Sequence, residues 1–302
     1  MQVAPPQDPS LLPEGGEVVV QGSVGRLILR TFAENKLAIV GVGFILVVLV
    51  FSFLGPLVYH TNQVASNLLQ VNMPPGAGHP FGTDQNGYDI LGRLMAGGQV
   101  SMEISFAVAI TATGLGTIYG AISGFLGGII DVVMMRIVDI GLAVPVIFLY
   151  ILMSRIFLPT KWLLIGLLAG LAWLGPARLI RGETLSLRTR DYVQAARSMG
   201  GRTRRIVLRH IIPNAIGTIV VNATFQIADA ILILATLDYL GFGLPPPTAA
   251  WGGMLSGGVI FLQDGYWWEV YPVLIMIVLA VVSFNFIGDA LRDSLEVRLQ
   301  RR

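Results

Sequence analysis

The chain has 302 residues, of which 54% are hydrophobic and only 13% are charged, and its formal net charge is +2. A soluble domain carries about 25% charged residues, so this composition indicates that lipid is the main solvent. The absence of cysteine excludes disulfides and thiolate metal sites. The three histidines, His60, His79 and His210, are too scattered in sequence to suggest a metal site.

The N-terminal segment combines a polar tail with a first apolar run. The first 25 residues contain Pro, Gly and acidic residues, which favours a disordered tail. The apolar run from Leu37 to Tyr59 is longer than the roughly 7–15 residues of a signal-peptide core, so we interpret it as an uncleaved membrane span.

Six apolar segments are interpreted as spans. A spanning helix needs roughly 20 apolar residues, and the third and fourth segments are shorter than that. In chain order the six segments are Leu37–Tyr59, Ile104–Ile130, about Ile140–Ser154, Trp162–Leu174, Asn214–Gly241 and Tyr271–Ile287. The sequence therefore predicts an all-α integral membrane protein with six transmembrane helices.

The distribution of Lys and Arg predicts the orientation of these spans. With the N-terminus inside, 17 of the 20 basic residues are cytoplasmic, and Arg93, Arg155 and Lys161 are external. We expect a cytoplasmic tail and lead-in at 1–36, a span at 37–59, an external loop at 60–103, a five-helix core at 104–290 and a cytoplasmic tail at 291–302. Within the core, 176–213 is a cytoplasmic loop and 242–270 is an external loop.

The chain lacks the motifs of several enzyme classes. Its only lysines, Lys36 and Lys161, follow Asn35 and Thr160, so a phosphate-binding loop ending in Gly-Lys-Ser/Thr is impossible. It has no His-Glu-x-x-His pair and no Gly-x-Ser-x-Gly elbow. An intramembrane protease would need paired catalytic groups, whereas Asp229 is the only acid near a span centre. We therefore expect no enzymatic activity in this chain alone, and no cofactor on it.

The cytoplasmic loop contains a short helix with its own start and stop signals. Asp191 followed by Gln194 has the pattern of a capping box, and Gly200-Gly201 is typical of a helix end. Between them, apolar side chains fall at helical spacing: Tyr192, Val193, Ala195, Ala196 and Met199. Two turns of helix are marginal in water, so this helix is expected to persist only by docking. The following arginines could instead serve only positive-inside topology.

Five motifs, in order, carry a family resemblance. They are Phe81-Gly-Thr-Asp-x-x-Gly87-x-Asp89 with Arg93, Asp131-x4-Arg136-x2-Asp139-x5-Pro145, Gln194-Ala-Ala-x-x-x-Gly200 followed by Arg209-His-Ile-Ile-Pro-Asn214, Leu240-Gly-Phe-Gly-Leu-Pro-Pro-Pro247 with Trp251-Gly252, and Asn285-x2-Gly288-Asp-x-Leu-Arg-Asp293 with Arg298. Together they resemble the second permease subunit of ABC importers of the dipeptide/oligopeptide (peptide/nickel) family.

The resemblance implies a type I ABC importer permease fold in a prokaryotic plasma (inner) membrane, with both termini cytoplasmic. It implies a second homologous permease, two ATPase subunits that hold ATP and Mg, and an external solute-binding protein as partners, with membrane lipid but no nucleic acid. The short helix would dock on an ATPase. The residues that it assigns to this coupling are Asp191, Tyr192, Gln194, Ala195, Ala196, Met199, Gly200, Arg205, Arg209, His210, Pro213 and Asn214.

The chain departs from the family pattern at a few positions. Gln194 replaces the usual Glu, Leu234 stands where the family often has an acid, and Asp238-Tyr239 replaces Ser-Phe. Asp229 or Asp238 could substitute for the missing acid in the pathway or gate, or the gate could differ.

A polar stripe runs along the fifth predicted span. Thr218, Asn222, Gln226 and Asp229 are spaced four, four and three residues apart, so they share one helix face. A carboxylate near mid-bilayer costs at least about 2.5–3.5 kcal/mol and usually faces a cavity or the bundle interior. We hypothesise that the stripe lines the translocation pathway; a polar contact with another span is the alternative.

Two further patterns in the spans have a structural and a functional interpretation each. Gly116, Gly120, Gly124 and Gly128 form a ridge for close packing, within the chain or at a dimer seam, and Gly166 and Gly170 repeat the spacing. Arg136 and Asp139 are spaced to pair on one helix, or could contact the ATPase.

The remaining aromatic and histidine signals are also open to two interpretations. Trp251, Tyr266, Trp267 and Trp268 have the composition of an interfacial belt, or of a contact with the solute-binding protein. His210 is interpreted as a hydrogen-bonding residue at a helix end rather than a pH sensor. An ion-gradient-driven secondary transporter that uses Asp229 as proton carrier is the alternative function; such folds tend to contain inverted repeats, and the sequence shows no clear one.

Overall fold

The structure is a computed structural model, and it describes residues 24–61, 63, 65–157 and 159–300. The predicted disordered tail lies outside these residues, except for Val24 and Gly25, which begin the first helix. Arg301 and Arg302 also lie outside the described residues. Within the described part every regular element is helical, apart from two isolated β-bridges in the loop that precedes α3. This confirms the all-α prediction.

The helices follow one another with short connections. In order they are α1 (Val24–Glu34), α2 (Lys36–Val58), α3 (Ile90–Leu126), α4 (Gly128–Ala143), α5 (Val146–Ile156), α6 (Lys161–Ala172), α7 (Leu174–Leu187), α8 (Asp191–Ser198), α9 (Thr203–Ile206), the π-helical turn η2 (Val207–Ile211), α10 (Ile212–Asn214), α11 (Ile216–Tyr239), α12 (Trp251–Val259), the 3₁₀ turns η3 (Leu262–Asp264) and η4 (Trp267–Glu269), and α13 (Tyr271–Gln300).

Four of these helical segments are long and apolar enough to cross a membrane, and two bent helix pairs would raise the number of spans to six. The pair α4 and α5 is bent by 80°, and the pair α6 and α7 by 41°. Length and composition thus support between four and six spans in the described part of the chain.

The third predicted span, about Ile140–Ser154, differs from the structure. A sharp break separates α4 from α5 in the middle of this apolar run. Pro145 explains the break, because proline disfavours helical geometry in the residue before it, and Val144 is extended with φ −92° and ψ 130°.

The second predicted span begins earlier than expected. The sequence places residues up to Glu103 in a loop, whereas α3 begins at Ile90, where the Asp89 carboxylate accepts a hydrogen bond from the Gly92 amide at 2.8 Å. Its 37 residues give a length of about 55 Å, well beyond the roughly 30 Å of a bilayer core. The extension was missed because Gly97, Gly98 and Glu103 lower its hydropathy.

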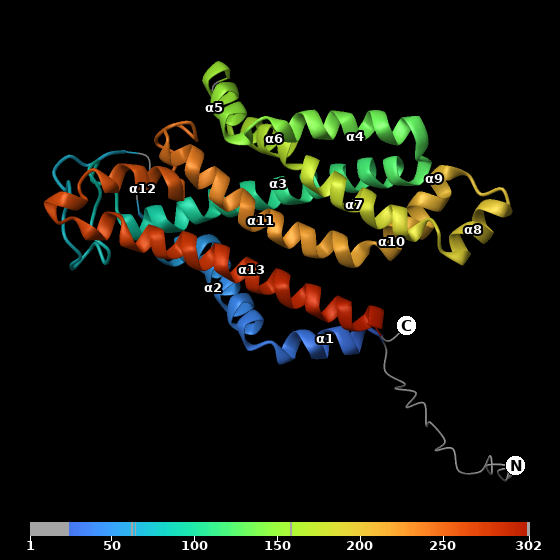
Figure 1. Cartoon of the computed structure of the whole chain (residues 1–302). Coiled ribbons are helices and arrows are strands. Elements are labelled where there is room, and N and C mark those ends of the chain that lie inside the picture. The colour runs from blue at the N-terminus through green and yellow to red at the C-terminus, as the bar shows by residue number, and fades with distance from the viewer. Residues whose placement is uncertain (1–23, 62, 64, 158, 301–302) are drawn as a thin grey trace, which may run out of the picture.

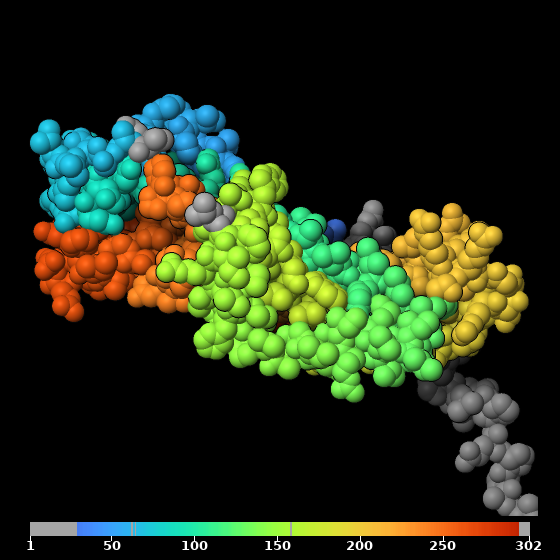
Figure 2. Space-filling view, turned by 90° about the horizontal axis from the view of Figure 1, so that it is seen from above, coloured from blue at the N-terminus to red at the C-terminus, as the bar shows by residue number. Residues whose placement is uncertain are grey.

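α3 is the central element of the molecule (Figure 1). It contributes residues to the core shared by α2, α11, α12 and α13, to a second core with α5, α6 and α11, and to a third with α7, α8 and α9. The loop of residues 60–89 and α12 lie at one end of α3, and α8 and α9 lie at the other (Figure 2).

The glycine ridge packs within the chain. A methyl group added at Gly116 would lie 2.6 Å from the Pro176 side chain, and one added at Gly124 would lie 2.8 Å from the Arg181 carbonyl oxygen, so α7 contacts the bare backbone of α3. Gly128 starts α4 and meets nothing within 4 Å, and Gly166 and Gly170 are likewise open. The intrachain interpretation is therefore confirmed for the α3 part of the ridge only.

Candidate functional site: a projecting short helix and a polar-lined pocket

The short helix predicted after residue 190 is present as α8, Asp191–Ser198. Its end is formed as expected: Gly200 has φ +77°, a conformation that glycine adopts without strain, and its amide hydrogen-bonds to the Arg197 carbonyl at 3.0 Å. The start differs from the prediction. Arg190 holds the N-cap position and makes no side-chain cap, so Asp191 and Gln194 form no capping box. The Gln194 amide donates instead to the Arg188 carbonyl at 3.3 Å.

One side of α8 is anchored to the rest of the protein. Val193 is 1% exposed and lies in the core that also contains Phe125 of α3 and Ile206 of α9. The Arg197 guanidinium lies 6.0 Å from the centre of the Phe125 ring, within cation–π range. These contacts explain how a helix of two turns persists, which its length alone would not allow.

The other side of α8 is exposed and partly apolar. Tyr192 is 42% exposed and Met199 is 82% exposed, and Ala195 between them is also exposed. Only Val193 and Ala196 of the predicted apolar face turn inward. Figure 2 shows this region, residues 188–214, projecting as a lobe at one end of the molecule.

The remaining residues predicted for coupling lie just after α8. Arg205 and Arg209 line an open hollow of about 450 Å³ with Arg202, Arg204 and Leu208. His210 lies in η2, and its backbone carbonyl accepts a hydrogen bond from the Asn214 side chain at 2.6 Å. Pro213 lies in α10, immediately before α11. The structure therefore gathers the predicted coupling residues at one end of the molecule.

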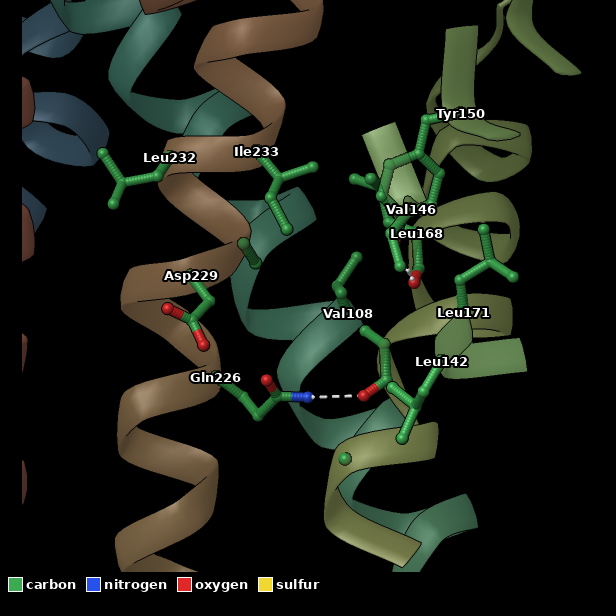
Figure 3. Close-up of a pocket in the computed structure, with 13 residues that line it drawn as sticks. Val108, Leu142, Val146, Tyr150, Leu168, Leu171, Gln226, Asp229, Leu232 and Ile233 are labelled. Atoms are coloured by element: carbon green, nitrogen blue, oxygen red, sulfur yellow. Dashed lines mark hydrogen bonds between the residues drawn. The ribbon is translucent and has the colours of Figure 1, made fainter. Parts of the chain in front are cut away.

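The polar stripe of α11 is only partly assembled into one cavity. A pocket of about 320 Å³ lies between α11 and the α3, α4, α5 and α6 helices, and Gln226 and Asp229 line it (Figure 3). Most of the other lining residues are apolar. Asp229 is exposed, while Thr218 and Asn222 are half-buried and do not line this pocket.

The stripe also makes an interhelical contact. The Gln226 amide donates to the Ala172 carbonyl at the end of α6, at 2.9 Å (Figure 3). Asn222 has a buried side-chain oxygen that makes no hydrogen bond within the described part of the chain. Gln226 thus makes the helix–helix contact that the alternative interpretation expects, whereas Asp229 is exposed beside the pocket, and a role of the stripe in the pathway stays a prediction.

Two predicted side-chain roles are wrong. Asp139 pairs with Arg178 of α7 at 2.5 Å rather than with Arg136, so this ion pair joins two helices. Trp251 is 1% exposed and donates to the Leu94 carbonyl of α3 at 3.1 Å, so it belongs to the core rather than to an interfacial belt. Trp268 is also buried, at 8% exposure.

A buried ion pair near the α8 lobe was not predicted. Asp131 accepts two hydrogen bonds from Arg181 of α7, both at 2.6 Å, and a third from Ser123 of α3 at 2.5 Å. A bidentate pair of this kind fixes orientation as well as contributing energy. It ties α4, α3 and α7 together next to the helices that support α8. The acidic and basic residues are 50 positions apart, so sequence spacing offered no signal.

Two family models match this chain. One describes the inner membrane component of binding-protein-dependent transport systems and matches residues 116–301, and the other describes the N-terminal transmembrane domain of oligopeptide transport permease C and matches residues 23–75.

Curated relatives cover most of the chain. The oligopeptide transport system permease protein OppC of Bacillus subtilis is 37% identical over 270 residues, which are 89% of this chain and 88% of that protein. The dipeptide transport system permease protein DppC of the same species is 34% identical over 272 residues, covering 90% and 85%. OppC of Mycobacterium tuberculosis H37Rv is 36% identical over 277 residues, covering 89% and 93%.

Proposed function

The chain belongs to the family of inner membrane components of binding-protein-dependent transport systems, and from this premise we propose that it is one permease subunit of an ATP-driven importer of peptide-like solutes. As a member of this family it is a multi-pass protein of a prokaryotic inner membrane and a transport subunit rather than an enzyme. The proposed complex adds a second homologous permease, two ATPase subunits that bind ATP and Mg, and an external solute-binding protein. This chain would form half of the translocation pathway, and the second permease would provide the opposite wall.

The proposed sidedness places the α8 end in the cytoplasm. The lobe of residues 188–214 carries a concentration of arginine, and Lys and Arg accumulate on the cytoplasmic side of membrane proteins. The start of α1 and the end of α13 lie toward the same end of the molecule as α8 (Figure 1), which agrees with cytoplasmic termini. The loop of residues 60–89 and α12 then face the solute-binding protein.

The observation that carries the proposal is the geometry of α8. It is a helix anchored on one side by Val193 and left open on the other along Tyr192, Ala195 and Met199. Because its anchor is the core that contains Phe125 of α3, a displacement of α8 would be transmitted as a rigid-body movement to the longest helix of the chain. We propose that an ATPase subunit binds the open face and drives such a movement.

A charge placed on the open face tests this role. Ala195→Glu should abolish co-purification of the ATPase subunit with the tagged chain and reduce uptake by at least tenfold, because a carboxylate would be buried in an apolar contact. Ser186→Glu adds the same charge to an exposed position of α7, outside the open face of α8, and it should keep most of the activity. Both variants should insert and unfold like wild type.

The rival function predicts a different outcome. A secondary transporter driven by an ion gradient would copurify with no ATPase, and its uptake would follow the gradient rather than ATP. Uptake that is insensitive to Ala195→Glu, in a preparation that contains no ATPase, would refute the proposed function.

A further inference from the structure

A small niche lies at the end of the molecule opposite α8, between the turn at residues 83–86 and the segment that leads into α13. Trp268 brings these parts together, since its indole N–H donates to the Thr83 carbonyl at 3.4 Å. The cavity has a volume of about 40 Å³, enough for one or two water-sized occupants. Its lining residues are Asp84, Gln85, Asn86, Ile90, Arg93, Gly253, Met254 and Glu269.

Glu269 is the unusual member of this niche. It is only 3% exposed, yet neither of its carboxylate oxygens has a hydrogen-bond partner among the described residues. In its ionised form, a buried carboxylate without a partner carries a penalty of several kcal/mol. Native proteins keep such a group where something else compensates it, so the two free oxygens point to a ligand.

The neighbouring charges do not compensate Glu269. Asp84 is close enough to repel it electrostatically, and the pKa of Asp84 is itself raised, chiefly by burial. Arg93 lies against Asp84, with Nε 3.8 Å from Oδ2, and donates to the Pro247 carbonyl at 3.1 Å. Arg93 therefore pairs with Asp84, and the described residues form no ion pair with Glu269.

The walls of the niche are compatible with an occupant of atomic size. A side chain at Gly258 of α12 would collide with Glu269, at 2.8 Å from its carbonyl oxygen and 2.9 Å from its Cβ. A side chain at Gly257 would lie 2.6 Å from the Gln85 amide nitrogen. Glycines at these two positions let α12 approach both lining residues and keep the niche small.

We propose that this niche binds a hard cation through oxygen ligands. The ligands would come from the Glu269 carboxylate and from the amide oxygens of Gln85 and Asn86, with the negative charge of Asp84 nearby and water completing the shell. Carboxylate and amide oxygens are the ligands that hard cations such as Ca²⁺ prefer. The bound ion would join the 83–86 turn to the start of α13, and so fix the outer ends of α3 and α13 relative to each other.

Thermal unfolding of the full-length chain in detergent tests this proposal without any transport assay. Tryptophan fluorescence is a suitable signal, because Trp268 adjoins Glu269 and contacts the turn. NaCl and CaCl₂ would be titrated separately, with N-methyl-D-glucamine chloride holding the ionic strength constant. We expect one of the two ions to raise the Tm by a few degrees and to reach saturation, because a ligand that binds only the folded state stabilises it.

Two variants make the result specific to the niche. Glu269→Gln should abolish the ion-dependent rise, whereas Asp264→Asn, which removes an exposed carboxylate five positions away, should retain it. Asp84→Asn should shift the midpoint of the titration to a severalfold higher ion concentration, and it serves as the test if Glu269→Gln does not fold. A wild-type Tm that is indifferent to both ions, or a rise that survives Glu269→Gln, would overturn the proposal.

Discussion

Gly116 of α3 offers a quantitative test of how closely α3 and α7 pack. A methyl group at this position would lie 2.6 Å from the Pro176 Cβ, 2.7 Å from the Trp173 carbonyl oxygen and 2.8 Å from the Ala177 amide nitrogen. Two of these three atoms belong to the backbone and cannot rotate away. Gly116→Ala should therefore force α7 to shift at its bend, and overpacking of this kind costs about 1–3 kcal/mol.

The matched control is Gly114→Ala, two residues earlier on the same helix, where an added methyl group meets nothing within 4 Å. Replacing glycine by alanine inside a helix contributes about 0.5–1 kcal/mol in either variant, so this term cancels in the comparison. Gly116→Ala should be less stable than Gly114→Ala by about 1–3 kcal/mol. Equilibrium unfolding of both variants in one detergent would measure the difference. Equal stabilities would refute the close approach of the two helices.

Three further outcomes follow from the geometry. Asp131→Asn should destabilise the chain by about 1.5–3 kcal/mol in the same unfolding assay, because it weakens the charged hydrogen bonds from Arg181; an unchanged midpoint would argue against the pair. Gly200→Val should cost about 1–2 kcal/mol through its left-handed φ, whereas Gly200→Asn should cost much less. Asp229→Asn should leave the unfolding midpoint unchanged, because the side chain is exposed. It should lower uptake and solute-stimulated ATPase activity in the reconstituted importer. Normal uptake would show that Asp229 is not part of the pathway.

Glycine positions and apolar runs in the sequence correctly predicted helix ends and one close helix contact. The double glycine after Met199 correctly indicated the end of α8, because a left-handed residue at that position strongly favours glycine. The four-residue spacing of Gly116, Gly120 and Gly124 correctly indicated a close helix contact, because only bare backbone permits that approach. The ends of α11 were predicted within two residues from the apolar run alone.

Long-range contacts were beyond sequence reasoning. Spacing suggested that Arg136 pairs with Asp139, but the fold brings Arg178 to Asp139 from another helix, which no local pattern reveals. Trp251 had the composition of an interfacial residue, yet the polar end of its indole is satisfied by a backbone carbonyl of α3, so the ring can be buried. Pro145 is a sequence signal for a helix break, but the apolar residues on both sides of it favoured a single span over about Ile140–Ser154.

Two residues of the polar stripe of α11, Gln226 and Asp229, indicate which walls of a translocation pathway this chain provides. Gln226 is satisfied by a carbonyl of α6, so it closes one side of the pocket. Asp229, one turn away and lining the same pocket, is exposed, and the described residues provide no ion-pair partner for it. A carboxylate in that position is tolerated in a membrane if it faces water or a polar partner. This asymmetry supports the proposal that a second permease subunit provides the opposite wall, and that the translocation pathway forms between the two chains rather than within this one.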